Sequence, residues 1–392
     1  MSTAVVLSAV RTPIGAFQGT LASVPAPRLG AAAIAEAVNR AGLQTSDVSD
    51  VLMGQVLQAG VGQAPARQAA IYAGLPSSTR AVTIHKVCGS GLQAVLQASY
   101  AVNAGDAEIA VAGGMENMSQ APFLLPKARE GFRLGHQQVV DSLISDGLWD
   151  PYNNLHMGMC AEQCAAKYGF SRAEQEAYAI RSFERASQAM RDGLVADELV
   201  SVEVKGSRGK ASLVEADEGP ARVDYAKIPT LRPAFDQAGT ITAATASTIN
   251  DGAAALVITS AREATARGLT PMARILSFGS HAQEPVWFTT APVQAATRAL
   301  ERAGWSVSDV DLWEVNEAFA VVPMAFMREL GLSHDQVNVR GGAISLGHPI
   351  GCSGARILVS LISALRERGL KRGVAAICIG GGEGLAACVE LD

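Results

Sequence analysis

The feature that most constrains the fold is an internal repeat. The segment AVNRAGLQTSDVSDV (37–51) aligns with ALERAGWSVSDVDLW (299–313) at an offset of 262 residues. At about the same offset, CGSGLQAVLQA (88–98) falls near HPIGCSGARILVS (348–360), and VAGGMEN (111–117) falls near CIGGGEG (378–384). Three matches in one order predict that the chain is built from two similar halves.

Within each half, helical and strand patterns alternate, which indicates βαβ units and a sheet rich in parallel strands. Loops that could bind a ligand would then lie at the carboxyl ends of the strands. The stretch between the halves breaks the pattern, contains one amphipathic helix, and is interpreted as an inserted loop region for binding or assembly. We predict helices at 27–41, 172–192, 291–303 and 352–368 and one from Ser90, with strands at 50–56, 81–87, 108–114, 310–315 and 373–379.

Composition narrows the function to that of a compact α/β enzyme. The net charge is -5 and no dense Lys/Arg run occurs, which argues against nucleic acid as a partner. No apolar stretch approaches a membrane span, and the first residues lack the basic start of a signal peptide. The six cysteines form no CxxC pair, which is typical of reduced thiols, so we expect a cytoplasmic protein without a zinc site or disulfide framework.

Cys88 is the candidate nucleophile. It lies between a strand pattern and a helix pattern, and Gly89 and Gly91 allow a sharp turn that places the thiol at a helix N-terminus. Such a position lowers the pKa of a thiol. The alternative is a buried structural cysteine.

Further polar candidates lie in loops expected at the same edge of the sheet. His348 occupies the loop equivalent by the repeat to that of Cys88, which predicts a nucleophile–base pair, and on its glycine-rich loop it has little core to pack into. Cys378 ends the last predicted strand and is otherwise an apolar strand residue. Asn316 follows another strand, with a helix N-cap as the alternative role. His156 is ambiguous between a helix start and a ligand contact.

Two other patterns give little support to further sites. Cys160 and Cys164 share a helix face, but no matching His or Cys pair completes a metal site. The glycines at 380–382 do not form a dinucleotide-binding fingerprint.

Along essentially its whole length the chain resembles the thiolases. The matching motifs appear in the family's order: RTPIG near the start, VCGSGLQA around Cys88, LRPAFDQAGTITA (231–243), ASTINDGAAA (246–255), NEAFA (316–320), GGAISLGHPIGCSGAR around His348 and CIGGGEG around Cys378. The resemblance implies an α/β thiolase fold, with two pseudo-symmetric halves in a five-layered αβαβα arrangement and an inserted loop domain. The implied limits are 1–118 plus 249–269 for the first half, 119–248 for the loop domain and 270–392 for the second half.

The resemblance also implies roles for individual residues. Cys88 would accept the acyl group, His348 would be its base and an oxyanion donor, and Cys378 would be the acid/base at the substrate α-carbon. Asn316 would hold a water in one oxyanion hole, and the N–H groups of Cys88 and Gly380 would form a second. The positions that match the coenzyme A (CoA) and acyl pocket are Leu148, His156, Met157, Phe235, Ala243, Ser247, Ala318 and Phe319.

The implied activity is the reversible condensation of two acetyl-CoA to acetoacetyl-CoA and CoA, through an acetyl-cysteine, in a homo-oligomer (dimer or tetramer) of lipid metabolism. No metal and no cofactor are expected, because the CoA thioesters are substrates. HMG at 156–158 favours the short-chain class over the broader 3-ketoacyl-CoA thiolases of β-oxidation. The segment 219–230, Arg340 and Trp287 depart from the family pattern, and Arg222 is the candidate for the CoA phosphates.

Two rival functions remain open from the residues. A decarboxylating ketoacyl synthase would need no second cysteine, so CIGGGEG favours a thiolase. A non-catalytic acyl-CoA binding protein would show no reactive thiol that acyl-CoA protects.

Overall fold

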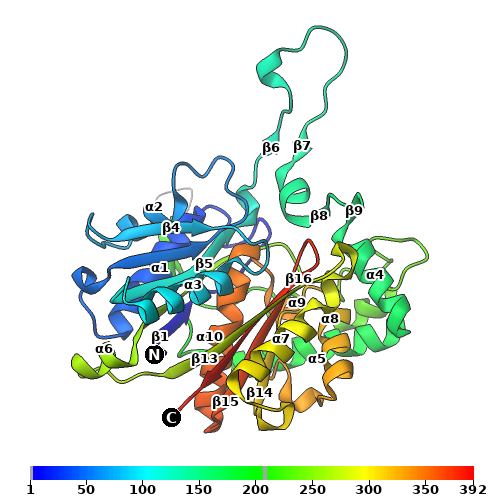
Figure 1. Cartoon of the computed structure of the whole chain (residues 1–392). Helices are drawn as coiled ribbons and strands as arrows, with labels where there is room; N and C mark the ends of the chain where they lie inside the picture. The colour runs from blue at the N-terminus through cyan, green and yellow to red at the C-terminus, as the bar shows by residue number, and fades with distance from the viewer. Residues whose placement is uncertain (1–2, 206–209) are drawn as a thin grey trace.

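Two similar halves form the body of the molecule (Figure 1). The computed structural model describes residues 3–205 and 210–392, so residues 1–2 and 206–209 of the predicted domains lie outside the described residues. The first half contains β1 (Ala4–Arg11), β2 (Gly15–Ala16), α1 (Ala26–Arg40), β3 (Asp50–Gly54), α2 (Pro65–Tyr72), β4 (Arg80–Ile84), α3 (Ser90–Ala104), β5 (Ile109–Asn117) and β12 (Asn250–Ser260). After α6 (Ala261–Ala266), the second half contains β13 (Ala273–Ala282), α7 (Ala291–Ala303), β14 (Leu312–Val315), α8 (Val321–Leu330), α9 (Ala343–Leu346), α10 (Ile350–Arg368), β15 (Arg372–Ile379) and β16 (Glu383–Glu390).

The strands form one mixed sheet in the order β14-β15-β16-β13-β1-β12-β5-β3-β4, and β2 pairs with β12. The halves join where β1 pairs with β13 through Val5 and Val6. Along this path, β3 runs parallel to β4 and β5, and β14 runs parallel to β15, whereas the other paired neighbours are antiparallel. The expectation of a sheet rich in parallel strands was therefore wrong. A short turn connects β15 to β16, and such a connection can only reverse the chain direction.

Helices separate the two halves and cover their outer faces, which gives the five layers. α3 and α10 pack against each other between the inner faces of the two half-sheets, and their apolar side chains form the central core. A second core lies under α1 and α2, and a third under α7 and α8. Two glycines let the central helices approach closely, because a Cβ on Gly91 would lie 2.7 Å from the Ala355 nitrogen and one on Gly354 would lie 2.5 Å from the Leu92 nitrogen.

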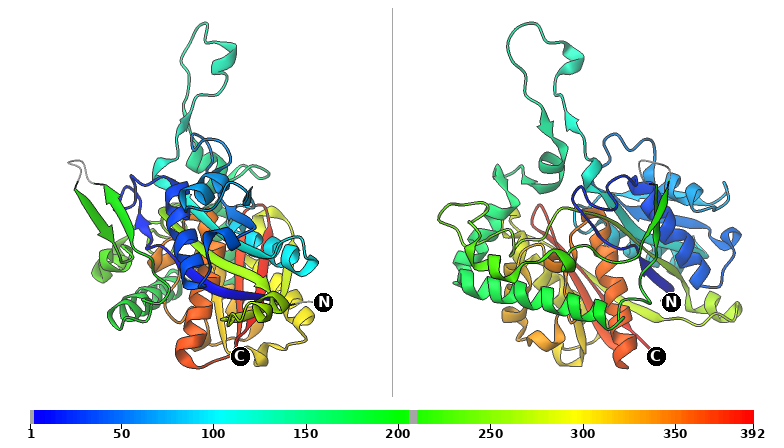
Figure 2. Two further views of the ribbon diagram at one scale, coloured as in Figure 1. Left: turned by 90° about the vertical axis from the view of Figure 1, so that its left-hand side faces the viewer. Right: turned by 180° about the vertical axis from the view of Figure 1, so that it is seen from behind.

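Residues between β5 and β12 form the stretch that was predicted as an insertion. Its helices and strands are β6 (Phe123–Leu124), β7 (Val140–Asp141), β8 (Trp149–Asp150), β9 (Leu155–His156), α4 (Met157–Tyr168), α5 (Arg172–Arg191), β10 (Val202–Lys205) and β11 (Ala211–Val214). The segment from β6 to β7 projects from the body as an arm (Figures 1 and 2). None of the helices among the described residues is long and apolar enough to cross a membrane.

A buried ionic cluster ties the insertion to β1. Arg11 is fully buried, and its Nε lies 2.8 Å from Glu198 Oε1, while its two terminal nitrogens lie 2.7 and 2.9 Å from the carboxylate oxygens of Asp217. Asp217 also accepts the backbone N–H of Ile14 at 2.8 Å. Although burial alone would lower the pKa of Arg11, the two carboxylates raise it, so the guanidinium stays charged.

Replacing Arg11 with methionine should destabilise the fold by about 3–5 kcal/mol, because two carboxylates would be left buried without their partner. Urea titration at fixed protein concentration measures this loss. Arg80→Met is the control: Arg80 is exposed and pairs with Asp50 on the surface, so little change is expected. Equal effects of the two variants would show that the buried cluster has no special role in stability.

Candidate active site

Cys88 follows β4 on a tight, strained turn that leads into α3. The preceding residue, Val87, has φ of +44°, a left-handed conformation that is rare for a β-branched side chain. Ser90 holds this turn, since its hydroxyl accepts from the N–H of Lys86 at 2.8 Å and donates to the carbonyl of Val87 at 2.7 Å. Strain of this kind costs about 1–3 kcal/mol and persists only where the surroundings enforce it. Here it fixes the direction in which the thiol points.

Gly89 brings this turn against the end of β15. A Cβ at this position would lie 2.4 Å from the side chain of Ile379, so a larger residue would push the two loops apart. As a result, the backbone N–H groups of Gly380 and of Cys88 itself lie close enough to the thiol to favour its charged form. Their predicted role as oxyanion donors stays a prediction.

His348 lies at the start of α10, held from two sides. Its backbone N–H donates to Asn250 Oδ1 at 2.9 Å, and its ring Nδ1 lies 2.6 Å from Ser353 Oγ. Gly347, with φ of +116°, lets the chain pass Asn250, where a Cβ would lie 2.3 Å from the amide. His348 is buried, so the expectation that it has little core to pack into was wrong: Asn250 and the first turn of α10 enclose it.

Cys378 and Asn316 lie at neighbouring strand ends, fully buried. Cys378 is in β15 and belongs to the apolar core under α7 and α8. Burial, and to a smaller extent the nearby Cys88, raise the pKa of its thiol well above the usual value. Asn316 directly follows β14 and does not cap α8, whose N-cap is Ala320. Neither side-chain atom of the Asn316 amide has a hydrogen-bond partner among the described residues.

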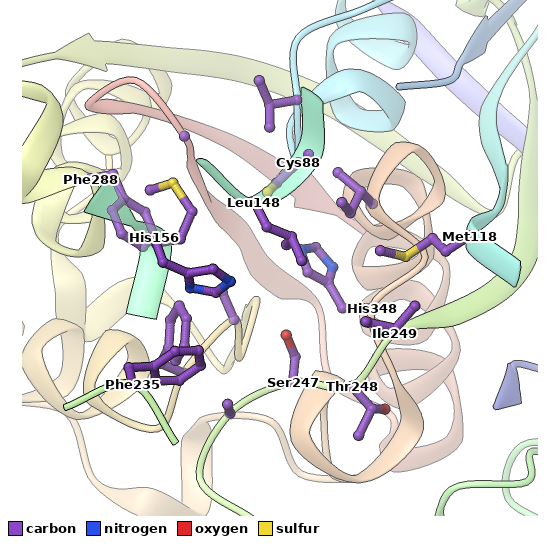
Figure 3. A pocket seen from close by; sticks show the side chains of 18 residues that line it. Cys88, Met118, Leu148, His156, Phe235, Ser247, Thr248, Ile249, Phe288 and His348 are labelled. Atoms are coloured by element: carbon purple, nitrogen blue, oxygen red, sulfur yellow. The ribbon is translucent and has the colours of Figure 1, made fainter. Parts of the chain in front are cut away.

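Cys88 and His348 line one cavity of about 200 Å³, whose walls are mostly apolar (Figure 3). His156, Phe235 and Phe288 lie on one side of it, and the ring centroids of His156 and Phe235 are 4.8 Å apart in a stacked arrangement. The helix-start interpretation of His156 is confirmed, since its Nδ1 accepts the N–H of Gly158 at 3.0 Å and caps α4, while its contact with a ligand stays a prediction.

The cavity includes most of the residues predicted for the site. These are Cys88, Leu148, His156, Met157, Phe235, Ser247, Ala318, Phe319, His348 and Gly380. Ala243 is exposed and does not line it, nor do Asn316 and Cys378. Sequence reasoning missed Val87, Met118, Gly147, Ala246, Thr248, Ile249, Phe288 and Ile350. Several of these adjoin predicted residues, and chain adjacency was the only signal that could have found them.

Glu116, which sequence reasoning also missed, connects the loops beneath the cavity. This buried carboxylate at the end of β5 accepts the N–H groups of Val56 and Leu57 at 3.0 and 3.1 Å and that of Gly351 at 2.8 Å. Burial raises its pKa to about 7, although the three N–H groups oppose the shift. Glu116 therefore joins the first half to the first turn of α10, beside His348.

Burial makes the resting Cys–His pair neutral. It raises the pKa of Cys88 to about 11, although the N–H groups of Gly380 and Cys88 act in the opposite direction. Burial, and then the charge of Arg356, lower the pKa of His348 to about 3. The expectation of a lowered thiol pKa was wrong, because loss of hydration outweighs the backbone N–H groups of Gly380 and Cys88. A neutral thiol of this kind would release its proton in the course of a reaction rather than before it.

The described residues also contain no group of three or more His, Cys, Asp or Glu side chains placed to hold a metal ion. Cys160 and Cys164 are both buried in α4 within the apolar core.

A thiol that shares an apolar cavity with a histidine is an arrangement typical of acyl-transfer sites. Comparison with known families agrees, since residues 4–262 match the thiolase N-terminal domain and residues 269–391 match the thiolase C-terminal domain. The chain therefore belongs to the thiolase family.

Relatives and solved structures match over nearly the full chain. An acetyl-CoA acetyltransferase of Cupriavidus necator is 50% identical, with 100% of both chains covered, and acetyl-CoA acetyltransferase 2 of Arabidopsis thaliana is 49% identical over 98% of this chain and 96% of its own. The crystal structure of the Bacillus anthracis acetyl-CoA acetyltransferase superposes with a TM-score of 0.98 at 40% identity, covering 100% of this chain and 99% of that one. The Acat5 thiolase of Ascaris suum, in complex with coenzyme A, gives 0.94 at 43% identity, with 100% of both chains covered.

The raised pKa of Cys88 predicts how its alkylation depends on pH. The thiolate is the reactive form, so the rate with iodoacetamide should rise about tenfold per pH unit from 7 to 10 without reaching a plateau. Mass spectrometry of the Cys88 peptide measures the rate, and Cys88→Ser gives the background from the five other cysteines, which are buried. A plateau below pH 8 would instead mean that the resting enzyme holds a thiolate–imidazolium pair.

Proposed function

We propose that the chain is an acetyl-CoA acetyltransferase, which condenses two acetyl-CoA to acetoacetyl-CoA and CoA and catalyses the reverse thiolysis. The observation that carries the proposal is the Cys88 thiol, which shares an apolar cavity with His348. The names of the full-length relatives support this choice of substrate.

The first half-reaction is acyl transfer to Cys88. Nε2 of His348 takes the thiol proton as the sulfur attacks the carbonyl carbon of acetyl-CoA. The N–H groups of Cys88 and Gly380, which favour negative charge beside the Cys88 sulfur, would stabilise the oxyanion. The bond between carbonyl carbon and CoA sulfur then breaks, and the His348 proton leaves with CoA as its thiol.

In the second half-reaction, the thiolate of Cys378 removes a proton from the α-carbon of the second acetyl-CoA. The resulting enolate, held by His348 and by a water on Asn316, attacks the acetyl-Cys88 carbonyl, the bond to the Cys88 sulfur breaks, and the Cys88 thiolate takes up the proton that Cys378 removed. The raised pKa of Cys378 keeps its proton in place at neutral pH, which suits the acid of the thiolysis direction. Condensation requires this thiol first to give its proton to solvent. The proposed chemistry uses CoA thioesters as substrates and no cofactor.

Binding and assembly are assigned to the insertion. Leu148, His156, Met157, Phe235 and Ser247 would contact the acyl group and the adjoining part of CoA. Ala243 and Arg222, both exposed, would lie along CoA outside the cavity, with Arg222 as the candidate for its phosphates.

We infer a homo-oligomer, a dimer or a tetramer, because the arm carries exposed apolar side chains, Leu134 among them with 97% of its surface accessible. Sedimentation velocity on the native chain measures its assembly. A cytoplasmic location and a place in lipid metabolism are part of the same proposal.

Serine substitution at each cysteine should separate the two half-reactions. Cys88→Ser should abolish both acetyl-enzyme formation and turnover. Cys378→Ser should still form the acetyl-enzyme but lose about 10²- to 10⁴-fold in turnover, since acid–base catalysis at the α-carbon is lost. Acid-quenched peptide mass spectrometry after incubation with acetyl-CoA, beside an assay of acetoacetyl-CoA with CoA, gives both readings.

Cys388→Ser is the matched control, because Cys388 is also fully buried on a strand of the same core. It should retain near wild-type turnover. If Cys378→Ser behaved like this control, a mechanism with one cysteine, as in a ketosynthase, would replace the one proposed. If no acetyl group were found on Cys88 of the wild-type protein, a non-catalytic acyl-CoA binding protein would be the better interpretation.

The cavity predicts a preference for short acyl chains. Its aromatic wall and Met157 leave little room beside Cys88, so the kcat/KM for acetoacetyl-CoA should exceed that for an eight-carbon 3-ketoacyl-CoA by at least about tenfold. Steady-state thiolysis of both substrates measures the ratio. Equal values would favour the broader 3-ketoacyl-CoA thiolases and leave the family assignment intact.

A further inference from the structure

Ser353 contacts Nδ1 of the His348 ring, the nitrogen that does not take part in the proposed proton transfer. It lies in the first turn of α10, buried, with its Oγ 2.6 Å from Nδ1 of His348 and 3.0 Å from the carbonyl oxygen of Pro349. The ring's other nitrogen, Nε2, is buried without a hydrogen-bond partner in the described part of the chain. Among the described residues, the Ser353 hydroxyl is therefore the hydrogen-bond partner of the His348 ring.

The hydrogen bonds of these three groups favour one tautomer. The Pro349 oxygen can only accept, so the single hydroxyl proton of Ser353 serves that bond. Ser353 Oγ then accepts from His348, which places the imidazole proton on Nδ1 and leaves a lone pair on Nε2. In the opposite tautomer Ser353 would donate to Nδ1, the Pro349 carbonyl would keep only the backbone N–H groups of Cys352 and Ser353, and the Nε2–H would be buried without an acceptor among the residues described.

We propose that Ser353 is the positioning residue of the histidine base: it holds the Nδ1–H tautomer and the ring orientation, so that the Nε2 lone pair faces the Cys88 thiol. This inference rests on the proposed acyl-transfer function. The backbone supports it, because the bond from Ser353 to the carbonyl four residues earlier fixes the Oγ rotamer. Since the partner is a neutral hydroxyl rather than a carboxylate, it orients the ring without adding the charge that would stabilise an imidazolium before substrate arrives.

The structure offers a matched control for removing this hydroxyl. Ser99 of α3 is also a buried helical serine of the central layer, and it donates to the carbonyl four residues earlier, that of Val95, at 2.7 Å. It does not contact His348. Ser353→Ala and Ser99→Ala therefore remove the same kind of helix bond, but only the first removes the partner of the base.

Acetylation of Cys88 by acetyl-CoA, followed by rapid quench, tests the proposal. Ser353→Ala should lower the maximal acetylation rate about 10- to 100-fold, the loss seen when partners that orient metal-bound histidines are removed, with little change in the acetyl-CoA concentration for half-maximal rate. Ser353→Thr keeps a hydroxyl and should recover most of the rate, and Ser99→Ala should stay within about twofold of the wild type. Equal losses in the two alanine variants would make the role merely structural and overturn the proposal.

A second measurement does not depend on activity. In wild-type protein labelled with ¹⁵N-histidine, the His348 signal, assigned by its loss in His348→Asn, should show a protonated Nδ1 and an unprotonated Nε2 at neutral pH. A proton on Nε2 would overturn the assignment of Ser353. Failure of the wild type to acetylate Cys88 would instead overturn the proposed function, whatever the tautomer.

Discussion

The close contact between α3 and α10 is the constraint on which the site depends. Gly91 and Gly354 leave no room for a side chain between the helices, so their first turns are held in a single buried layer. Cys88 precedes the first helix and His348 precedes the second. Larger residues at these glycines would separate the helices and, with them, the proposed nucleophile and base. Each copy of the internal repeat thus supplies one helix and one side chain of the proposed pair.

Desolvation then determines the electrostatic character of the site. Burial favours a neutral thiol at Cys88 and a neutral imidazole at His348, and in the proposed acyl transfer the developing charge would meet backbone N–H groups of the same loops. Val87, strained next to the thiol, and Glu116, which joins loops of both halves, hold these groups in position. Preorganised dipoles are effective here because water, which would otherwise screen them, is largely excluded.

Much of this arrangement could be predicted from the sequence because it follows local rules. The repeat, the glycines around Cys88 and the loop at His348 gave the halves, the helices of the central layer and the nucleophile–base pair. The strands β1 and β16 were not predicted. Both are apolar runs, and an apolar run alone does not show that it forms a strand or with which strand it pairs. Phe288 and Ile249 come to the cavity from segments far from Cys88 in the chain, so only the folded structure reveals them. The direction of the Cys88 pKa shift depends on how far the folded chain shields the half-buried thiol from water, which no local motif encodes.

The origin of the cavity walls has a consequence for how such a chain can diverge. The groups assigned to bond making lie on the two halves, in the rigid layers, whereas Leu148, His156, Met157 and Phe235 come from the stretch between β5 and β12. Substitutions in that stretch can reshape the space for the acyl group without moving the glycine-packed helices. Selection can therefore act on substrate choice and on reactivity almost independently. This separation lets one scaffold acquire new specificities in small steps, each of which leaves a working catalyst.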